Sequence, residues 1–193
     1  ITFGAMAGGA VLLPKLTSTA RTSFSASGAN SKIDLRSMAS GADVTFTLAG
    51  NSLIEAPLLT SVVNGSISTD GTNQFPFSQL ASIDATSITA SGGAKISFPL
   101  ITEFELGVSG DFDTITATGA GSEISFPNLV SVTALELFTR ITIGAAAGGA
   151  VLVPKLTSTV RTSFNASGAN SKIDLRSMAS GAGVTFTLAG NAL

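Results

Sequence analysis

Four acidic residues lie close together in the middle of the chain: Glu103, Glu105, Asp111 and Asp113. On an extended strand, side chains two positions apart face the same way, so the two pairs can converge. Paired carboxylates can hydrolyse a glycosidic bond, and carboxylates together with backbone oxygens can bind Ca²⁺. This acidic cluster is therefore the first candidate site. The cations closest to it in the sequence are Lys95 and Arg140.

The residue types that would complete an enzyme are missing. The sequence contains no His and no Cys, so a Ser or Cys nucleophile has no imidazole base. It also contains no Tyr or Trp to grip a sugar ring, no Gly-Gly-x-Gly-x-Asp calcium repeat and no phosphate-binding loop. We therefore predict that the chain is not an enzyme and holds no cofactor or metal. The acidic cluster is better interpreted as a solvated loop that keeps neighbouring rods apart.

Charge and hydropathy argue against two further classes of protein. Only 11% of the 193 residues are charged and the formal net charge is −2, whereas nucleic-acid binding needs a basic patch. The sequence has no run of about 18 apolar residues, so we predict no membrane-spanning helix. The partners that we expect are other copies of the chain and, as an alternative, a surface polysaccharide.

The chain repeats itself. Residues 141–193 match residues 1–53 at 46 of 53 positions without a gap, which defines a repeat of 140 residues. A chain that copies itself this closely is an array of stacked units. Because the sequence starts and stops inside a repeat, we expect residues 1–193 to form a single segment of a longer array.

A shorter period lies inside the 140-residue repeat. A phrase of alternating apolar residues followed by Pro and a further apolar residue recurs at 11–16, 96–101, 124–129 and 151–156, with weaker copies between. Its last apolar positions are 21 or 22 residues apart, except for two spacings of 28 and 27 that end at Leu129 and Leu156. Six such steps make one 140-residue repeat.

The residues between these phrases predict strands and turns. Apolar residues alternate with Ser and Thr, as in 44–48 and 115–118, and Gly or Asn returns once per period. We therefore predict an all-β fold, a parallel β-solenoid (β-helix) of about eight coils of 21–22 residues with two or three longer coils of 27–28. Parallel crossovers are almost always right-handed, so the solenoid should be right-handed. The extra residues of the longest coil, around Gly107–Gly110, should bulge from the rod.

Stacking of the coils predicts two inward ladders of apolar side chains. The first ladder consists of Ile33, Ile54, Phe75, Ile96, Ile124 and Val151. The second ladder consists of Leu35, Ala56, Phe77, Phe98, Phe126 and Val153. One coil cannot bury its inner face alone, so these ladders should form the core that holds neighbouring coils together.

Pro and Asn mark the turns between the strands. The Pro residues at 14, 57, 99, 127 and 154 follow inward residues, and they should lie at corners because Pro cannot donate to a sheet ladder. Asn30, Asn51 and Asn73 follow small residues, at positions where Asn tolerates a left-handed backbone. We predict that the side chains of these Asn residues stack and bond from coil to coil.

The phrase Phe126-Pro127-Asn128-Leu129-Val130-Ser131-Val132 resembles the F-P-N-L-x-S-V repeats of surface proteins with receptor-L-type, leucine-rich-like β-helical domains. It is similar also to the repeats of large bacterial surface proteins that fold as parallel β-helices. The resemblance implies a right-handed solenoid that is extracellular or located at the cell surface. It implies no catalytic residue.

These observations predict a structural repeat segment of an extracellular fibre, filament or surface layer that assembles by coil stacking. The first alternative is an adhesin or a ligand-binding module for carbohydrate or for ice. Outward Thr-x-Thr pairs, such as Thr45 with Thr47 and Thr116 with Thr118, can match an ice lattice. A carbohydrate-active β-helix enzyme that uses the acidic cluster is the last alternative.

Overall fold

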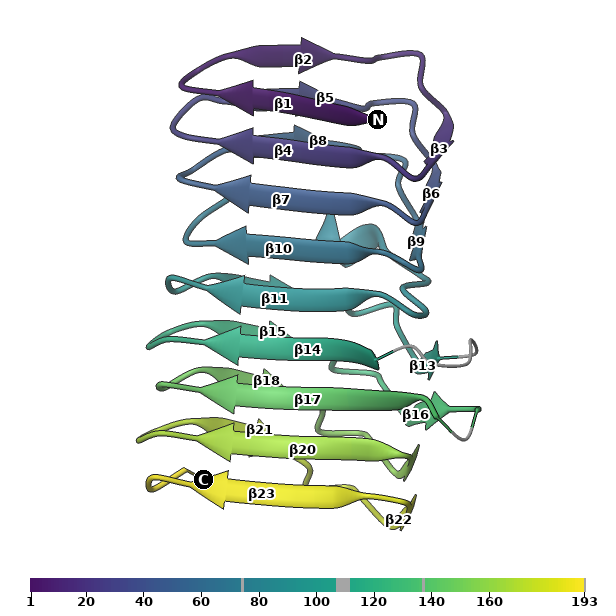
Figure 1. The fold of residues 1–193 in the computed structure, drawn as a ribbon, viewed down its shortest axis with the longest axis vertical. Helices are drawn as coiled ribbons and strands as arrows, with labels where there is room; N and C mark the ends of the chain where they lie inside the picture. The colour runs from purple at the N-terminus through teal and green to yellow at the C-terminus, as the bar shows by residue number, and fades with distance from the viewer. Residues whose placement is uncertain (74, 107–111, 137, 193) are drawn as a thin grey trace.

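Alternating apolar and hydroxyl residues form short strands that wind into stacked coils (Figure 1). The computed structural model describes residues 1–73, 75–106, 112–136 and 138–192. Over this part of the chain, every strand pairing is parallel, and the one helix is a single 3₁₀ turn, η1 (Phe77–Gln79). The chain is therefore an all-β parallel solenoid, as the sequence predicts.

The strands form three walls. The first sheet takes one strand from each coil, in the stacking order β1 (Thr2–Met6), β4 (Ser23–Ser27), β7 (Thr45–Ala49), β10 (Ser66–Asp70), β11 (Ser87–Ser91), β14 (Phe112–Thr118), β17 (Arg140–Ala146), β20 (Thr162–Ser167) and β23 (Thr185–Ala189). The second wall contains β2 (Ala10–Leu12), β5 (Lys32–Asp34) and β8 (Leu53–Glu55), then β12 (Lys95–Ser97), β15 (Glu123–Ser125), β18 (Ala150–Leu152) and β21 (Lys172–Asp174). The third wall contains β3 (Ser18–Ala20), β6 (Ser40–Ala42) and β9 (Ser61–Val63), then β13 (Glu103–Leu106), β16 (Ser131–Ala134), β19 (Ser158–Val160) and β22 (Ser180–Ala182).

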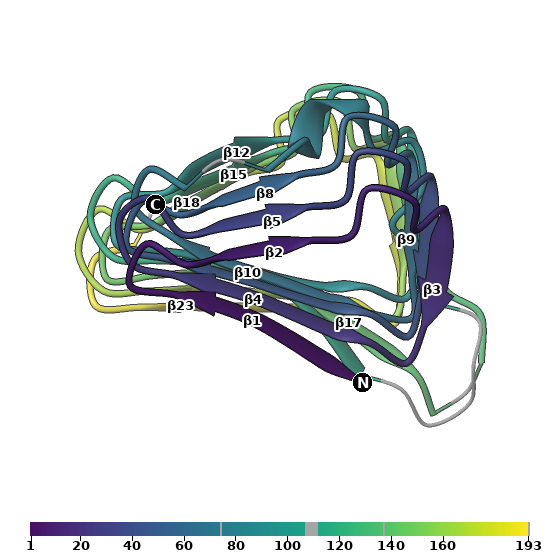
Figure 2. The ribbon, with the colours of Figure 1, turned by 90° about the horizontal axis from the view of Figure 1, so that it is seen from above.

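The coils wind with a right-handed sense. Viewed from the N-terminal end, the chain runs along β1, turns into β2 and reaches β3 in a clockwise direction (Figure 2). Each turn moves the chain away from that viewpoint, from purple at one end to yellow at the other (Figure 1). Right-handed parallel crossovers are the expected outcome for strands with a right-handed twist.

The interior is filled by stacked apolar side chains from all three walls. Strand alternation puts one side chain in two inside, as in β7, where Phe46 and Leu48 are buried and their neighbours are not. In the second wall, Ile33 pairs in register with Ile54, and Ile96 pairs with Ile124. All of the predicted ladder residues are buried except Phe75, which is partly buried against the core.

The fourth coil interrupts the second wall, and this differs from the prediction of continuous ladders. Phe75 and Pro76 belong to no strand, because Pro76 has no N–H to donate and the chain turns into η1. The Phe75 ring still bridges the gap, with its centroid 4.9 Å from the rings of both Phe46 and Phe77. Tilted contacts between aromatic rings thus replace backbone pairing at this level, while the first sheet continues through it.

The recurrent Pro residues lie at the corner between the second and third walls. At the corners of Pro14, Pro57, Pro127 and Pro154, the N–H two residues after the Pro donates to the carbonyl of the residue before it, as between Leu59 and Ala56, at 3.0 Å, and between Leu156 and Val153, at 3.1 Å. Pro therefore occupies the second position of a tight turn, where its fixed φ is favourable.

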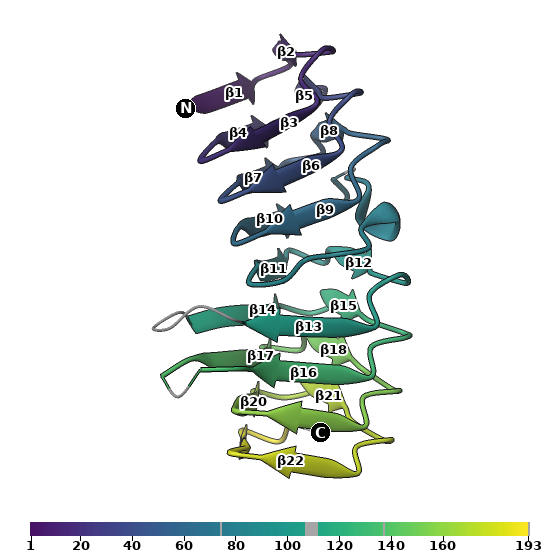
Figure 3. The same ribbon diagram turned by 90° about the vertical axis from the view of Figure 1, so that its right-hand side faces the viewer.

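The corner between the third wall and the first sheet explains the two coil lengths. In the short coils one residue with φ between +49° and +66° makes this corner: Arg21, Asp43, Asn64, Ala85, Arg161 or Gly183. In the two long coils, longer connections take its place, between β13 and β14 and between β16 and β17. The β16–β17 connection extends outward from the corner (Figure 3). The predicted bulge around Gly107–Gly110 lies outside the described residues.

The two copies of the repeated segment lie in the same rod. Strand β1 begins the first copy and β17 begins the second, and six strands of the first sheet, from β1 to β14, fill one 140-residue repeat. The second copy therefore continues the stack and does not fold back against the first (Figure 1).

Candidate functional site

The acidic cluster is divided between two walls. Glu103 and Glu105 lie on β13 with exposed side chains that face the same way, whereas Asp113 lies on β14 of the first sheet and is partly buried. Asp111 lies outside the described residues. The Oδ1 atom of Asp113 accepts a hydrogen bond of 2.9 Å from Oγ of Ser87 on the preceding coil.

Asp113 therefore joins coils, while the two Glu side chains face solvent. Among residues 1–73, 75–106, 112–136 and 138–192, no group of three acidic side chains lies close enough to hold a metal ion. The backbone N–H of Glu105 donates to Oδ1 of Asp84, at 2.9 Å, which again links one coil to the next. The described part of the cluster thus makes coil-to-coil contacts, through the Asp113 carboxylate and the Glu105 backbone.

The predicted Asn turns have two different structures. Asn30 and Asn51 have φ values of +65° and +63°, so they take the left-handed conformation expected at a turn. Asn73 does not, and this prediction was wrong because Asn73 is level with Ser52, one position after the residue that corresponds to Asn51. The Asn73 side chain instead accepts a hydrogen bond of 2.8 Å from the N–H of Ser52 and donates one of 3.1 Å to the carbonyl of Leu48.

Asn73, which is partly buried, is level with a row of buried Ser residues that the sequence analysis missed. These residues stand two positions before the first inward residue of a second-wall segment. They are Ser31, Ser52, Asn73, Ser122 and Ser171. Oγ of Ser122 accepts a hydrogen bond from the N–H of Gly93 and donates one to the carbonyl of Thr118, at 3.0 and 2.8 Å. The signal in the sequence was a Ser two positions before the inward apolar residue.

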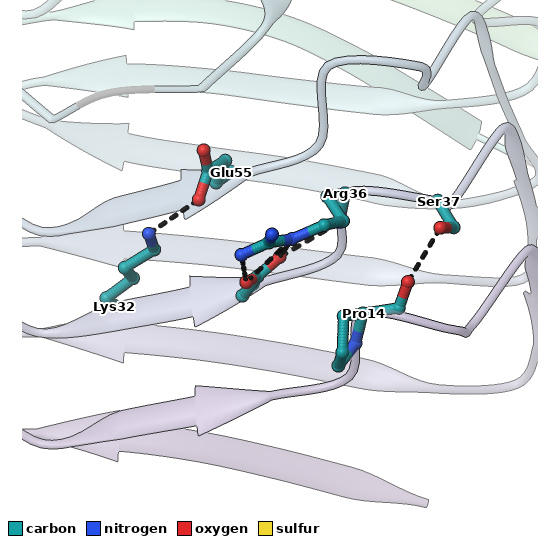
Figure 4. A network of polar contacts seen from close by, with 6 residues as sticks. Pro14, Lys32, Arg36, Ser37 and Glu55 are labelled. Carbon is teal, nitrogen blue, oxygen red and sulfur yellow. Dashed lines mark hydrogen bonds and ion pairs between the residues drawn. The ribbon is translucent and has the colours of Figure 1, made fainter.

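A ladder of charged side chains runs along the second wall (Figure 4). Nζ of Lys32 lies 2.5 Å from Oε2 of Glu55 on the next coil, with both side chains partly exposed. Arg36 pairs with Asp34, whose carboxylate is almost fully buried, and the backbone N–H of Arg36 donates to the same carboxylate at 3.1 Å. The Ser37 hydroxyl donates to the Pro14 carbonyl at 2.6 Å, so this corner is tied to the preceding coil.

The Asp–Arg pair recurs in the second copy and depends on pH. Hydrogen bonds from Arg36 and Arg176 hold the pKa of Asp34 and of Asp174 below their ordinary value of 3.8. A carboxylate whose pKa is lowered in the folded state contributes stability above its unfolded pKa. That contribution is lost as the pH falls through the folded value, so both pairs should weaken only below about pH 4.

We expect the thermal unfolding midpoint to fall as the pH is lowered from 5 to 2, and to fall less in an Asp34→Asn, Asp174→Asn variant. A second variant, Arg36→Met, Arg176→Met, keeps both carboxyls but removes the groups that lower their pKa. It should also show the weaker dependence. Equal pH dependence in all three proteins, measured by circular dichroism, would contradict this account of the two pairs.

The outer face of the first sheet carries hydroxyl groups in register. One row consists of Thr2, Ser23, Thr45, Ser66, Ser87, Thr114, Thr142, Ser163 and Thr185. The neighbouring row consists of Gly4, Ser25, Thr47, Ser68, Thr89, Thr116, Gly144, Asn165 and Thr187. In the first row some hydroxyls bond within the protein, as Ser66 does to Thr45 at 3.2 Å. Strand pairing therefore aligns the outward Ser and Thr residues of successive coils.

The fold defines this chain as a parallel β-solenoid protein. Comparison of the chain with protein-family models, with curated proteins and with solved structures finds no match. None of the helical segments in the described residues has the length and apolar character needed to cross a membrane.

Proposed function

We propose that the chain is a structural segment of a fibre, filament or surface layer that assembles by stacking of its coils. The observation that carries this proposal is that the 140-residue repeat adds six coils along the rod, with the second copy in the same sheet as the first. Repetition in this form generates length and a periodic surface. An active site, in contrast, needs one unique constellation of side chains.

The last coil supports assembly with a further coil. Phe186 and Leu188 on β23 are 54% and 64% exposed, whereas the equivalent Phe46 and Leu48 on β7 are fully buried under the next coil. A further coil, from the same chain or from a second copy, could pair with the backbone edge of β23 and cover these two side chains. A second copy stacked on this edge would make a head-to-tail contact, and such contacts produce filaments when they do not close.

The resemblance to repetitive surface proteins supports a location outside the cell or at the cell surface. In such a location a rod of this kind would serve as a spacer or as part of a lattice. The charged and hydroxyl-bearing outer faces would keep the sides of the rod hydrated, so association would occur mainly at the ends.

Electron microscopy of the purified chain over a range of concentrations tests this proposal. We expect unbranched fibres one rod wide at high concentration. Phe186→Asp should prevent their formation, whereas Leu58→Asp, which alters a side chain that is 57% exposed on the flank, should not. Single rods at every concentration, or fibres that persist in Phe186→Asp, would overturn end-to-end assembly.

A second candidate function is binding to ice, and the register of the two hydroxyl rows favours it. The second row, which includes Thr47 and Thr116, makes no side-chain hydrogen bond to other described residues, so its hydroxyls can bond to ordered water. Inhibition of ice recrystallisation should then be lost in Thr47→Lys, Thr116→Lys and kept in Thr60→Lys, which alters another wall. Equal growth of ice crystals with and without the unaltered protein would exclude this function.

A further inference from the structure

A cleft with aromatic and cationic side chains lies where the two long coils meet the second copy of the repeat. It has a volume of about 340 Å³, and its lining residues are Phe112, Phe138, Thr139, Arg140, Arg161 and Gly183. Phe112 and Phe138 are 69% and 75% exposed, although neither belongs to an end coil. Phe138 and Thr139 lie between β16 and β17, and Arg140 begins β17, so the cleft lies at the corner between the third wall and the first sheet.

The two guanidinium groups in this cleft are held by uncharged acceptors. Nη1 of Arg161 donates to the carbonyls of Ala134 and Leu135, at 3.0 and 3.1 Å. Nη1 of Arg140 donates to the hydroxyl of Ser163, at 2.8 Å. In the described part of the chain neither Arg has an acidic partner within ion-pair distance, and no acidic side chain lines the cleft. Among the described residues, both guanidinium groups are thus held in position without an acidic partner.

In the first copy of the repeat, the arginine equivalent to Arg161 has an acidic partner. Arg21 occupies the position of Arg161 there, and its Nε lies 3.8 Å from the carboxylate of Asp43. Asp43 corresponds to Gly183, one of the seven positions at which the two copies differ. The substitution removes the acid and leaves open space beside Arg161. The lost carboxylate points to the kind of group that the cleft can accept.

We propose that this cleft binds the carboxylate of an acidic saccharide, a chain of uronic-acid units. The guanidinium fork of Arg161 matches a carboxylate in geometry as well as charge, and Arg140 adds a second cation. The faces of Phe112 and Phe138 offer an apolar surface for the carbon side of a sugar ring. The site goes beyond the proposed structural role, because it needs no contact between rods.

The surroundings favour a saccharide over an acidic peptide. Arg140 bonds to the hydroxyl of Ser163, which belongs to the first hydroxyl row. On the two neighbouring strands this row continues at Thr142 and Thr185. A polymer that places a carboxylate in the cleft can therefore extend its hydroxyl groups along a face of Ser and Thr side chains. An extended peptide has fewer groups that can bond there, and the sheet backbone is already paired.

Isothermal titration calorimetry with a trisaccharide of galacturonic acid tests the proposal, with the trisaccharide of galactose as the neutral probe. We expect binding of the acidic probe only. Arg161→Gln should weaken it about tenfold or more, as expected for the loss of a charge-assisted contact. Binding of both probes with equal affinity, or of neither, would overturn the proposal.

The first copy of the repeat supplies matched controls for substitutions at Gly183. Gly183→Asp should restore the ion pair of the first copy and reduce binding as strongly as Arg161→Gln does. The backbone tolerates Asp there, because Asp43 has a φ of +51° and Gly183 one of +66°. Asp43→Gly and Arg21→Gln, in the first copy, should leave the affinity unchanged.

Two further outcomes would reject this site. Binding that is insensitive to Gly183→Asp would place the saccharide elsewhere on the rod. Tighter binding of a tri-glutamate peptide than of the galacturonate probe would assign the cleft to an acidic protein segment. Fibre formation by Gly183→Asp is a separate readout, so failure of this proposal is distinguishable from failure of the structural role.

Discussion

Phe98→Ala is expected to lower the free energy of unfolding by about 3–5 kcal/mol. The Phe98 side chain is fully buried, and its ring stacks on that of Phe126 with centroids 4.9 Å apart. It also meets the ring of Phe77 edge to face, at 5.7 Å. Truncation of Phe98 removes contacts with the coils on both sides at once. The loss of stability should therefore exceed the loss caused by removing one methyl group from the core.

Denaturant unfolding followed by far-ultraviolet circular dichroism measures this effect. Phe98→Asp should prevent that coil from forming, because the ladder has no partner for a buried charge. Phe138→Ala, at a side chain that is 75% exposed, is the matched control and should change the stability by less than about 0.5 kcal/mol. Equal losses in Phe98→Ala and Phe138→Ala would mean that the inward ladder is assigned to the wrong register.

Gly149→Ala is expected to destabilise the middle of the rod by about 3 kcal/mol. A Cβ atom at Gly149 would lie 2.3 Å from the carbonyl oxygen of Ala117 and 2.6 Å from its carbon, on the coil above. These are backbone atoms of β14, so relief of the clash requires the turn between β17 and β18 to move away from β14.

The repeat again supplies a control. Gly9 is the equivalent residue of the first copy, and a Cβ atom there would come no closer than 3.0 Å, to the carbonyl of Met6 in its own turn. Gly9→Ala should therefore cost much less than Gly149→Ala in the same unfolding experiment. Similar costs for the two substitutions would show that the clash comes from the turn and not from the coil above.

Much of the architecture follows from the sequence because it depends on short periods. The alternation of apolar and hydroxyl residues fixes which side chains enter the core, and the spacing of 21 or 22 residues fixes which of them stack. Phe98 and Phe126 are 28 residues apart yet still stack, because the extra residues are accommodated at one corner. The inward phrase thus remains in register across coils of different length.

The departures from the prediction come from the positions that individual residues occupy within a coil. Asn73 lies 21 residues after Ser52 and takes the place of that Ser, so its side chain bonds to the preceding coil and its backbone is not left-handed. Pro76 breaks the second wall at a position where the apolar pattern alone predicts a strand. The break at Pro76 is not visible in the period of the apolar pattern, because it depends on which residue occupies that one position.

The cleft could not be predicted from the sequence because it depends on connections that protrude from the rod. Phe112 and Arg140 are far apart in the sequence but lie opposite each other in the pairing of β14 with β17. The change from Asp43 to Gly183 is visible when the two copies are aligned, but its meaning depends on the ion pair that Asp43 makes with Arg21. Structure was needed to connect these facts.

The length of particles that contain one, two and three 140-residue repeats tests the central claim most directly. Coils separated by the strand spacing of about 4.8 Å advance the rod by roughly 28–29 Å for every six coils. Small-angle X-ray scattering should therefore show a constant cross-section and a length that increases by this amount with each added repeat. Particles that become wider while their length stays constant would mean that the repeats pack side by side, and would contradict the continuous solenoid.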